Sequence, residues 1–431
     1  MPREMPTSRA EIAAIQSRRK VAAVEQARRA PFHRGRLDAV RTDRLDDPDE
    51  WRKIPILDKE ALRALTDSAF YETFCLKPED GIAEYWRSGG ATGKPLFYPR
   101  SFHDIRHALR SFARTFACIG VGHGESAHNS FPLGIHPAGQ IYARSATEAG
   151  IAMNWAGAGT TTPSPLQIDL IKRLKPTTWM GMPSYGLHLA NLADVHGIDL
   201  AASSVETVIC SAEPLSQAKR TKLERAWGAR VRDTFGMTEA GMMGAEDADG
   251  PGRGFRVWTD MYFVEVVDTD SHAPVAPGEV GALVVTPLWT NNVTPFVRWL
   301  SGDLVTMAEG EEVEGRPFSV FPLVRHAHRT SGFFKVRGVN VGHAEFEDFM
   351  FAIDAINDFK CELVGGDGLD AMRVSIELAR GAEAGQVTSA LVPSIKRTFE
   401  ITAEVVVLET GTLAREFESS VKAPRFVDRR Q

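Results

Sequence analysis

The sequence predicts an α/β protein with a large N-terminal region of mainly parallel sheets flanked by helices, followed by a small α+β region. Three observations predict this fold class. From about residue 120 to 240, short apolar runs alternate with helical patterns, the order typical of parallel sheets. Between about 255 and 325 the pattern changes to strands and turns, which indicates a β-rich subdomain. After a break near 325–332, residues 333–431 alternate strand and helix.

The individual elements follow from the spacing of apolar residues. Residues 8–30 place apolar side chains at helical intervals among charged ones, which predicts an exposed amphipathic helix. A short capped helix is expected after Asp58, and a longer helix over 101–119. In the alternating region we predict helices over 165–175, 185–196 and 216–227, and strands over 178–182, 205–210 and 231–235.

Composition narrows the function classes. The chain has 431 residues and a net charge of −6, without a long basic run, which argues against nucleic acid as the main partner. No apolar stretch approaches the roughly 18 residues of a membrane helix, and the N-terminus does not look like a secretory signal. The cysteines are few and widely spaced (Cys75, Cys118, Cys210 and Cys361). We therefore expect a protein of the reducing cytoplasm without a disulfide framework.

Residues 87–95, Arg-Ser-Gly-Gly-Ala-Thr-Gly-Lys-Pro, are the most informative segment. Bare backbone N–H groups in such a loop suit the oxygens of a phosphate chain, and a lysine adds positive charge. The P-loop pattern fails, because Ser88 stands where its first glycine belongs and Pro95 replaces its hydroxyl residue. A plain glycine-rich hairpin explains the segment equally well. The candidate phosphate-binding residues are Ser88, Gly90, Thr92, Gly93 and Lys94.

A second candidate segment is Asp-Thr-Phe-Gly-Met-Thr-Glu at 233–239, after a predicted strand. Phe235 beside Gly236 offers a flat apolar wall that suits a stacked purine. Thr238 and Glu239 supply a hydroxyl and a carboxylate at a strand end, where open α/β sheets bind ligands and where Mg²⁺ finds its preferred oxygen ligands. The alternative is an ordinary strand end with a capped turn.

Two shorter segments carry weaker signals. Residues 298–303 predict a turn ending in Asp303, whose carboxylate suits the two hydroxyls of a ribose, although Ser-Gly-Asp is also a common turn. Residues 211–214, Ser-Ala-Glu-Pro, follow another predicted strand and offer a backbone edge for an adenine. In isolation this second segment is better explained as a helix cap.

Two single residues complete the candidates. Lys422 lies near the C-terminus, and by itself it is interpreted as one more solvated charge. His136 follows a run of apolar residues and is a candidate for lining a pocket.

The order and spacing of these segments resemble the adenylate-forming superfamily, and more narrowly its phenylacetate–CoA ligase branch, over the full chain. Residues 88–95 are similar to the branch's Ser-Ser-Gly-Thr-Thr-Gly-Lys-Pro loop, and residues 235–239 to its Tyr-Gly-Leu-Ser/Thr-Glu. Residues 337–341, Arg-Gly-Val-Asn-Val, are identical to its motif. Further similar segments are 30–34, 182–185, 212–214, 302–304 and 422–429.

The resemblance implies a role for each matched residue. The expected nucleotide-binding residues are Ser88, Gly90, Thr92, Gly93, Lys94, Ser211, Ala212, Glu213, Pro214, Asp233, Thr234, Phe235, Gly236, Asp303 and Arg329. Glu239 is expected to hold Mg²⁺, Lys422 and Thr238 to act in catalysis, and Arg337 and Gly338 to contact coenzyme A. The acid pocket is expected at Phe131, His136, Met237 and Met242, whose side chains suit a flat aromatic acid.

The implied enzyme joins an aromatic carboxylic acid to coenzyme A, consuming ATP with Mg²⁺ and releasing AMP and diphosphate. Residues 1–328 would form the N-terminal adenylation domain, and residues 329–431 a mobile C-terminal domain that rotates between the two steps. The resemblance also suggests a homodimer. The chain departs from the branch at Gly89 and Ala91, which replace hydroxyl residues, and at Ser331 and Gly332, which replace two hinge acids.

Three alternatives remain open from the sequence. A deazaflavin adenylyltransferase would stop at nucleotide transfer, and a related enzyme would load the acyl group onto a carrier-protein thiol. The altered loop and hinge also fit a degenerate nucleotide-binding protein without catalytic activity.

Overall fold

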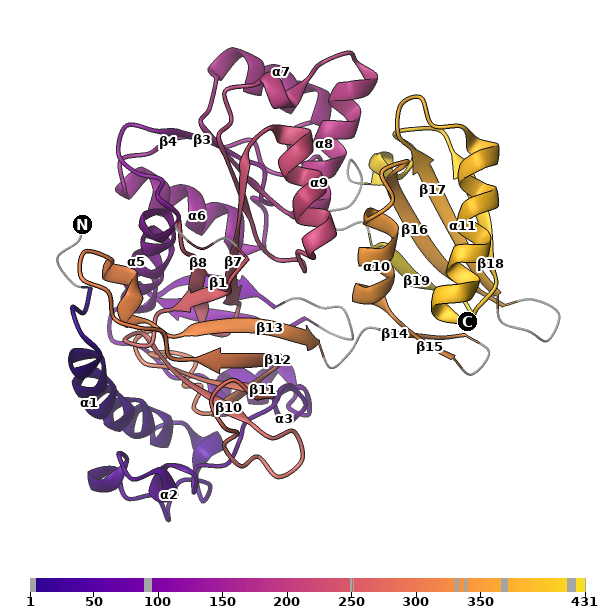
Figure 1. The fold of residues 1–431 in the computed structure, drawn as a ribbon. Helices are drawn as coiled ribbons and strands as arrows, with labels where there is room; N and C mark the ends of the chain where they lie inside the picture. Colours follow the sequence, from indigo (N-terminus) through magenta and orange to yellow (C-terminus); the bar gives the residue numbers. More distant parts are fainter. Residues whose placement is uncertain are drawn as a thin grey trace. The chain divides into compact units, whose positions relative to one another are not determined.

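A computed structural model of the chain describes residues 5–88, 95–248, 250, 252–329, 333–336, 339–365, 371–416 and 424–430 (Figure 1). The chain divides into two compact units. The first contains residues 1–124, 133–152 and 232–330, and the second contains residues 125–132, 153–231 and 331–431. Among the described residues, no helix is both long and apolar enough to cross a bilayer.

The first unit combines helices with an antiparallel arrangement of strands. Its helices are α1 (Arg9–Arg28), α2 (Pro48–Trp51), α3 (Lys59–Arg63), α4 (Asp67–Ala69), α5 (Phe102–Ile119) and α6 (Pro137–Glu148). Its strands are β1 (Ile82–Arg87), β2 (Phe97–Ser101), β7 (Arg230–Met237), β8 (Gly241–Glu246), β9 (Phe255–Val257), β10 (Tyr262–Val267), β11 (Val280–Pro287), β12 (Trp299–Ala308) and β13 (Leu323–Arg329).

Most of these strands belong to one series, and β1 and β2 pair separately as an antiparallel hairpin. The strands of the series lie in the order β10-β11-β12-β13-β9-β8-β7, and every neighbouring pair is antiparallel. The predicted β-rich subdomain is therefore confirmed. The strand predicted at 231–235 is present as β7, but its partner β8 runs antiparallel to it.

The second unit contains the parallel layer that the sequence predicts, and a C-terminal part. The elements of the layer are β3 (Ser126–Asn129), β4 (Ala152–Asn154), α7 (Ser164–Leu174), β5 (Thr178–Gly181), α8 (Pro183–Val195), β6 (Thr207–Cys210) and α9 (Gln217–Trp227). Strands β6, β5 and β3 are neighbours in parallel. The alternation predicted from the sequence is confirmed, because fully buried strands need apolar residues on both faces.

The C-terminal part, residues 331–431, is the predicted α+β region. Its elements are β14 (Phe333–Val336), β15 (Val339–Gly342), α10 (His343–Phe351), β16 (Ile356–Val364), β17 (Ala371–Leu378), α11 (Ala384–Phe399), β18 (Ala403–Leu408) and β19 (Phe426–Asp428). Its larger sheet has the order β18-β17-β16-β19, and α11 lies along it in Figure 1. The domain boundary predicted at 328/329 stays a prediction.

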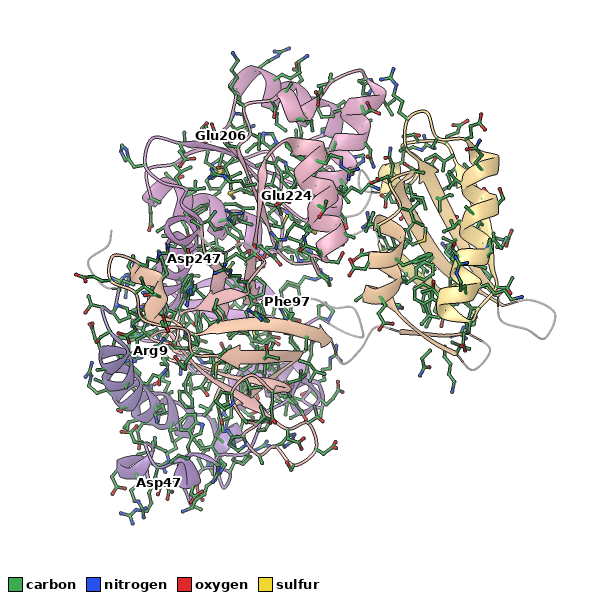
Figure 2. All side chains as sticks on the ribbon, viewed as in Figure 1. Arg9, Asp47, Phe97, Glu206, Glu224 and Asp247 are labelled. Atoms are coloured by element: carbon green, nitrogen blue, oxygen red, sulfur yellow. The ribbon has the colours of Figure 1, made fainter. Side chains whose placement is uncertain are left out.

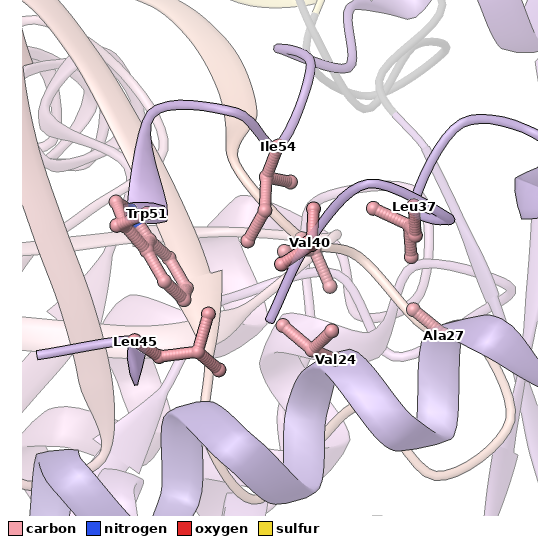
Figure 3. Close-up of a cluster of buried hydrophobic side chains, with 8 residues drawn as sticks. Val24, Ala27, Leu37, Val40, Leu45, Trp51 and Ile54 are labelled. Atoms are coloured by element: carbon pink, nitrogen blue, oxygen red, sulfur yellow. The ribbon is translucent and has the colours of Figure 1, made fainter. Parts of the chain in front are cut away.

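Helix α1 is anchored by its apolar face. Val24 and Ala27 are fully buried, and they face Leu37, Val40, Leu45, Trp51 and Ile54 from the segment that follows (Figure 3). The helix begins at the side chain of Ser8, which accepts a hydrogen bond from the Glu11 N–H. The helix expected at 8–30 is confirmed, and burial of its apolar stripe stabilises it more than intrinsic propensity does.

Helix α5 begins with a capping box. The Ser101 hydroxyl accepts a hydrogen bond from the Asp104 N–H at 3.1 Å, and Asp104 Oδ2 accepts one from the Ser101 N–H at 3.0 Å. Such reciprocal bonds satisfy backbone donors that the helix itself leaves free. The helix ends at Gly120, which has a left-handed φ of 89° that glycine adopts without strain.

Replacing Ser101 with alanine should lower the free energy of unfolding by about 1 kcal/mol, because both cap bonds at this helix start are disturbed. Urea denaturation measures the change. Ser68→Ala, at an exposed serine, is the matched control. Equal midpoints for the two variants would contradict this account of the α5 start.

Candidate active site

The glycine loop is closed at its neck by a pair of hydrogen bonds. The Ser88 N–H donates to the Leu96 carbonyl at 2.8 Å, and the Leu96 N–H donates to the Ser88 hydroxyl oxygen at 2.9 Å. Phe97, labelled in Figure 2, opens β2 directly after this neck. Of the predicted loop residues, Gly90, Thr92, Gly93 and Lys94 lie outside the described part of the chain. Their phosphate-binding roles stay predictions.

Glu239 stands in the turn between β7 and β8, and a residue of the loop hairpin holds its carboxylate. The Tyr98 hydroxyl donates to Glu239 Oε1 at 3.1 Å. Both side chains are buried, with Glu239 only 8% exposed. Burial, and then the negative charge of Glu239, raise the pKa of the Tyr98 phenol well above its usual value. Tyr98 therefore stays protonated and donates to the carboxylate.

Arg100 fixes the backbone of the same turn. Its Nη2 donates to the carbonyl oxygens of Thr238 at 2.6 Å and of Glu239 at 2.7 Å. Its Nη1 donates to the Thr290 carbonyl at 2.8 Å and to the Thr294 hydroxyl at 3.0 Å. With a residue exposure of 1%, this guanidinium is a rigid internal clamp.

This arrangement fits the predicted role of Glu239 as a ligand of Mg²⁺. One carboxylate oxygen is fixed by Tyr98, and the backbone is fixed by Arg100. The contact with Tyr98 involves Oε1, and a carboxylate oxygen is the type of ligand that a hard cation prefers. Neither Tyr98 nor Arg100 was identified from the sequence. Their only signal was a tyrosine and an arginine on the strand directly after the loop.

Removing the Tyr98 hydroxyl should weaken metal binding without unfolding the protein. In Tyr98→Phe we expect the Mg²⁺ concentration that half-saturates turnover to rise about tenfold, because hydrogen bonds to a metal ligand tune its affinity. A magnesium titration of the reaction measures this value. The control is Tyr71→Phe, which removes an exposed hydroxyl that donates to the Phe97 carbonyl. A response of Tyr98→Phe identical to the control would contradict the role of this hydroxyl.

Phe235, the predicted apolar wall for a purine, is a buried residue of β7, and purine stacking on it stays a prediction. Its ring centroid is 5.4 Å from that of Phe255 and 4.8 Å from that of His326, which meets it edge-on. Gly236 is required beside it, because an added Cβ would lie 2.6 Å from the Gly241 carbonyl oxygen of β8. Both residues lie within β7 rather than after it.

Asp233 and Thr234 are held in the strand by neighbouring polar groups. The Asp233 N–H donates to Glu246 Oε2 at 2.9 Å, and the Asp233 carboxylate accepts from the Thr234 N–H. The Thr234 hydroxyl lies 2.7 Å from the hydroxyl of Tyr142 on α6. These contacts fix the strand beneath the Phe235 wall, and nucleotide binding by Asp233 and Thr234 stays a prediction.

Asp303 does not lie in a turn, so that prediction is wrong. It is a buried residue of β12, and its backbone partner in β13 is Arg329. Gly302 has a φ of 86°. A glycine with this backbone conformation is common in turns, but here it lies in a strand with an irregular register. The pairing brings together two predicted nucleotide-binding residues. Nothing beyond the backbone position of Arg329 is described.

The predicted pocket residues divide between the units. In the first unit, Met242 is buried in β8, and Met237 packs on a cluster that includes Tyr98. His136 precedes α6, and its Nε2 lies 3.1 Å from Arg87 Nη1. Since a guanidinium only donates, Nε2 of His136 is the acceptor in this contact. In the second unit, Phe131 is fully buried after β3.

The segment 211–214 follows β6 with a strained backbone. Ala212 is exposed and has a φ of 69°, a conformation that costs a non-glycine residue about 1–2 kcal/mol. Glu213 Oε2 accepts a hydrogen bond from the Ser184 N–H at 3.1 Å. The interpretation of the segment 211–214 as a helix cap is wrong, because Ser216 caps α9. Strain of this kind persists where the surroundings hold it, often at functional sites. Ser211 and Pro214 flank the strained turn.

Three predicted residues cannot be placed. Lys422, Arg337 and Gly338 lie outside the described residues, and their roles in catalysis and in coenzyme A binding stay predictions.

The chain is similar to known proteins over nearly its whole length. A family model described as AMP-binding enzyme matches residues 11–289, and one described as AMP-binding enzyme C-terminal domain matches residues 338–430. The chain is 27% identical over 436 residues to phenylacetate-coenzyme A ligase of Escherichia coli (strain K12), covering 97% of this chain and 95% of that protein. It is also 27% identical over 390 residues to the phenylacetate-coenzyme A ligase of Pseudomonas putida, covering 88% and 84%.

A solved structure has the same fold. It is a 2-hydroxyisobutyryl-CoA ligase in the postadenylation state in complex with 2-HIB-AMP. It is 22% identical to this chain, has a TM-score of 0.85, and is matched over 100% of this chain and 92% of its own. The likeness confirms the predicted fold class.

Proposed function

The chain belongs to the family of AMP-binding enzymes, and we propose that it ligates an aromatic carboxylic acid to coenzyme A at the expense of ATP. One observation carries the proposal: Tyr98 joins the hairpin of the glycine loop to the buried carboxylate of Glu239. The strand that follows the proposed phosphate-binding loop is thereby joined to the carboxylate that we propose as the metal ligand. The names of the relatives, phenylacetate-coenzyme A ligases, support the choice of acid and acceptor.

The proposed reaction has two steps. First, a carboxylate oxygen of the acid attacks the α-phosphorus of ATP, the bond to the bridging oxygen breaks, and diphosphate leaves. Then the sulfur of the deprotonated CoA thiol attacks the carbonyl carbon of the acyl-adenylate, and AMP leaves. Activation is needed because the charge of a free carboxylate repels nucleophiles, whereas the mixed anhydride has a good leaving group.

Each group of residues has a task in the first step. The loop that Ser88 closes would bind the phosphates through its backbone N–H groups, and Lys422 would neutralise charge that develops on the α-phosphate. When bound, Mg²⁺ would neutralise phosphate charge, and Glu239, fixed by Tyr98, would hold it. Phe235 would provide an apolar face for the adenine, and Asp303 would accept hydrogen bonds from the ribose hydroxyls.

The acid is proposed to carry a polar substituent on its aromatic ring. The support is the Arg87–His136 pair, which gives an otherwise apolar set of pocket residues a charged donor. His136→Ala should therefore change the ranking of ring-substituted acids in the adenylation reaction. An unchanged ranking would contradict this part of the proposal.

Exchange of labelled pyrophosphate into ATP tests the first step. We expect exchange that depends on an aromatic acid from a panel of phenylacetates and benzoates. In the complete reaction, product formation that needs no thiol would favour a deazaflavin adenylyltransferase. A requirement for a carrier protein instead of coenzyme A would favour the loading enzyme. Absence of exchange across the panel would support the non-catalytic alternative. We propose the cytoplasm as its compartment, where four free thiols stay reduced.

A further inference from the structure

Arg425 is a buried charged residue, and the proposed reaction assigns no role to it. It immediately precedes β19, and its residue exposure is 9%. Its Nε donates to Asp358 Oδ1 of β16 at 2.9 Å, and its Nη2 lies 2.7 Å from the same oxygen. The guanidinium also lies 5.1 Å from the ring centroid of Phe351. Nε and Nη2 therefore face Asp358, whereas Nη1 points to another partner.

Nη1 of Arg425 donates to the hydroxyl of Ser184, which is buried in the first turn of α8. The backbone N–H of Ser184 in turn donates to Glu213 Oε2 at 3.1 Å. A chain of polar contacts therefore runs from Asp358 in the C-terminal part to the strained turn at Ala212, which is predicted to frame the adenine. The two contacts of Arg425 are buried, so these charge-assisted hydrogen bonds resist competition from water, and the contact of Ser184 with Glu213 is partly buried.

The C-terminal part is also held on α9 by contacts that do not involve Arg425. Lys219 Nζ lies 2.8 Å from Glu347 on α10, and both side chains are buried. Lys222 donates to the Ile356 carbonyl, and Arg225 lies 2.7 Å from Asp354. These three basic residues recur every third position on one side of α9. Because they dock the C-terminal part by themselves, loss of the Arg425–Ser184 bond need not release it.

We propose that Arg425 is a positioning residue that couples docking of the C-terminal part to the nucleotide-binding turn at 211–214. Docking places Arg425 on Ser184, and Ser184 fixes Glu213. Lys422, the lysine proposed for the first step, stands three residues before Arg425 in the sequence. The inference rests on the proposed function for the adenine-binding role of the turn at 211–214 and for the role of Lys422. It predicts an effect on nucleotide binding and adenylation, and none on attack by the thiol.

The first test measures binding of AMP by calorimetry, which needs no knowledge of the acid. Arg425→Lys keeps a cation beside Asp358 but loses the reach to Ser184, and Ser184→Ala removes the other partner. We expect each variant to weaken AMP binding about tenfold, and the double variant to be no weaker than either single variant. Arg429→Gln is the control, because Arg429 pairs with Glu362 within the C-terminal part. Thermal unfolding of every variant separates this effect from misfolding.

Unchanged AMP affinity in either single variant, or additive losses in the double variant, would overturn the proposal. A second test uses, for pyrophosphate exchange, the acid of the panel that supports the fastest exchange, and the synthetic adenylate of that acid with coenzyme A for the thiol step. The proposal expects Ser184→Ala to slow exchange and to leave thioester formation unchanged, and equal losses in both would contradict it. If the wild-type protein shows no exchange with any acid, the proposed function fails, while the AMP measurement still decides the role of Arg425.

Discussion

Glu239→Gln should lower the rate of acid-dependent pyrophosphate exchange about 10²–10³-fold, because it removes the charge that binds the metal. The substitution preserves the size of the side chain, and the glutamine amide oxygen still accepts the Tyr98 hydrogen bond. The folded structure should therefore persist, and the loss should appear in the reaction. Pyrophosphate exchange measured over a range of Mg²⁺ concentrations gives both the rate and the metal dependence.

The matched control is Glu279→Gln, which neutralises an exposed carboxylate that accepts a local hydrogen bond from the Ala276 N–H. Wild-type exchange and an unaltered magnesium dependence in Glu239→Gln would remove Glu239 from the metal site. If Glu239→Gln lowers only the thermal stability and leaves exchange unchanged, Glu239 has a structural role.

Lys422→Ala should separate the two steps. We expect pyrophosphate exchange to fall about 10²–10³-fold, because a positive charge beside the α-phosphate stabilises the charge of the transition state. Formation of the thioester from synthetic acyl-adenylate and coenzyme A should persist, because the lysine is proposed to leave the site before the thiol attacks. The two rates are measured separately on the same preparation.

Lys396→Ala is the control for this variant, since Lys396 is an exposed lysine on α11 of the same C-terminal part. If Lys422→Ala and Lys396→Ala both retain wild-type exchange, Lys422 is a surface charge, as its immediate neighbours in the sequence suggest. If Lys422→Ala slows adenylation and thioester formation equally, the proposal that Lys422 acts only in adenylation is contradicted.

Local sequence signals predicted most of the fold because they coincide with the forces that form the elements. Ser101 and Asp104 set the start of α5, and the apolar runs of β5 and β6 require burial on both faces. The signals failed where one residue pattern serves two structures. The glycine at 302 suggests a turn around Asp303, but pairing of β12 with β13 turns it into an irregular strand.

The site was only partly predictable for a related reason. Glu239 stands at the end of a strand with a recognisable motif, so its own sequence identifies it. Tyr98 and Arg100 acquire their roles only through contact with a turn about 140 positions away, and nothing in their neighbourhood specifies that contact. Arg425 is similar, because its partner Ser184 is 241 positions distant. Long-range polar contacts of this kind depend on the folded structure.

The most direct test of the central claim is the release of AMP from ATP and Mg²⁺ with a panel of aromatic acids, with and without coenzyme A. The account predicts sustained AMP release only when an acid and coenzyme A are both present. Sustained release that needs an acid but is indifferent to coenzyme A would contradict ligation to the thiol. No release under any condition, with Lys422→Ala indistinguishable from the unaltered protein, would contradict the assignment as a ligase.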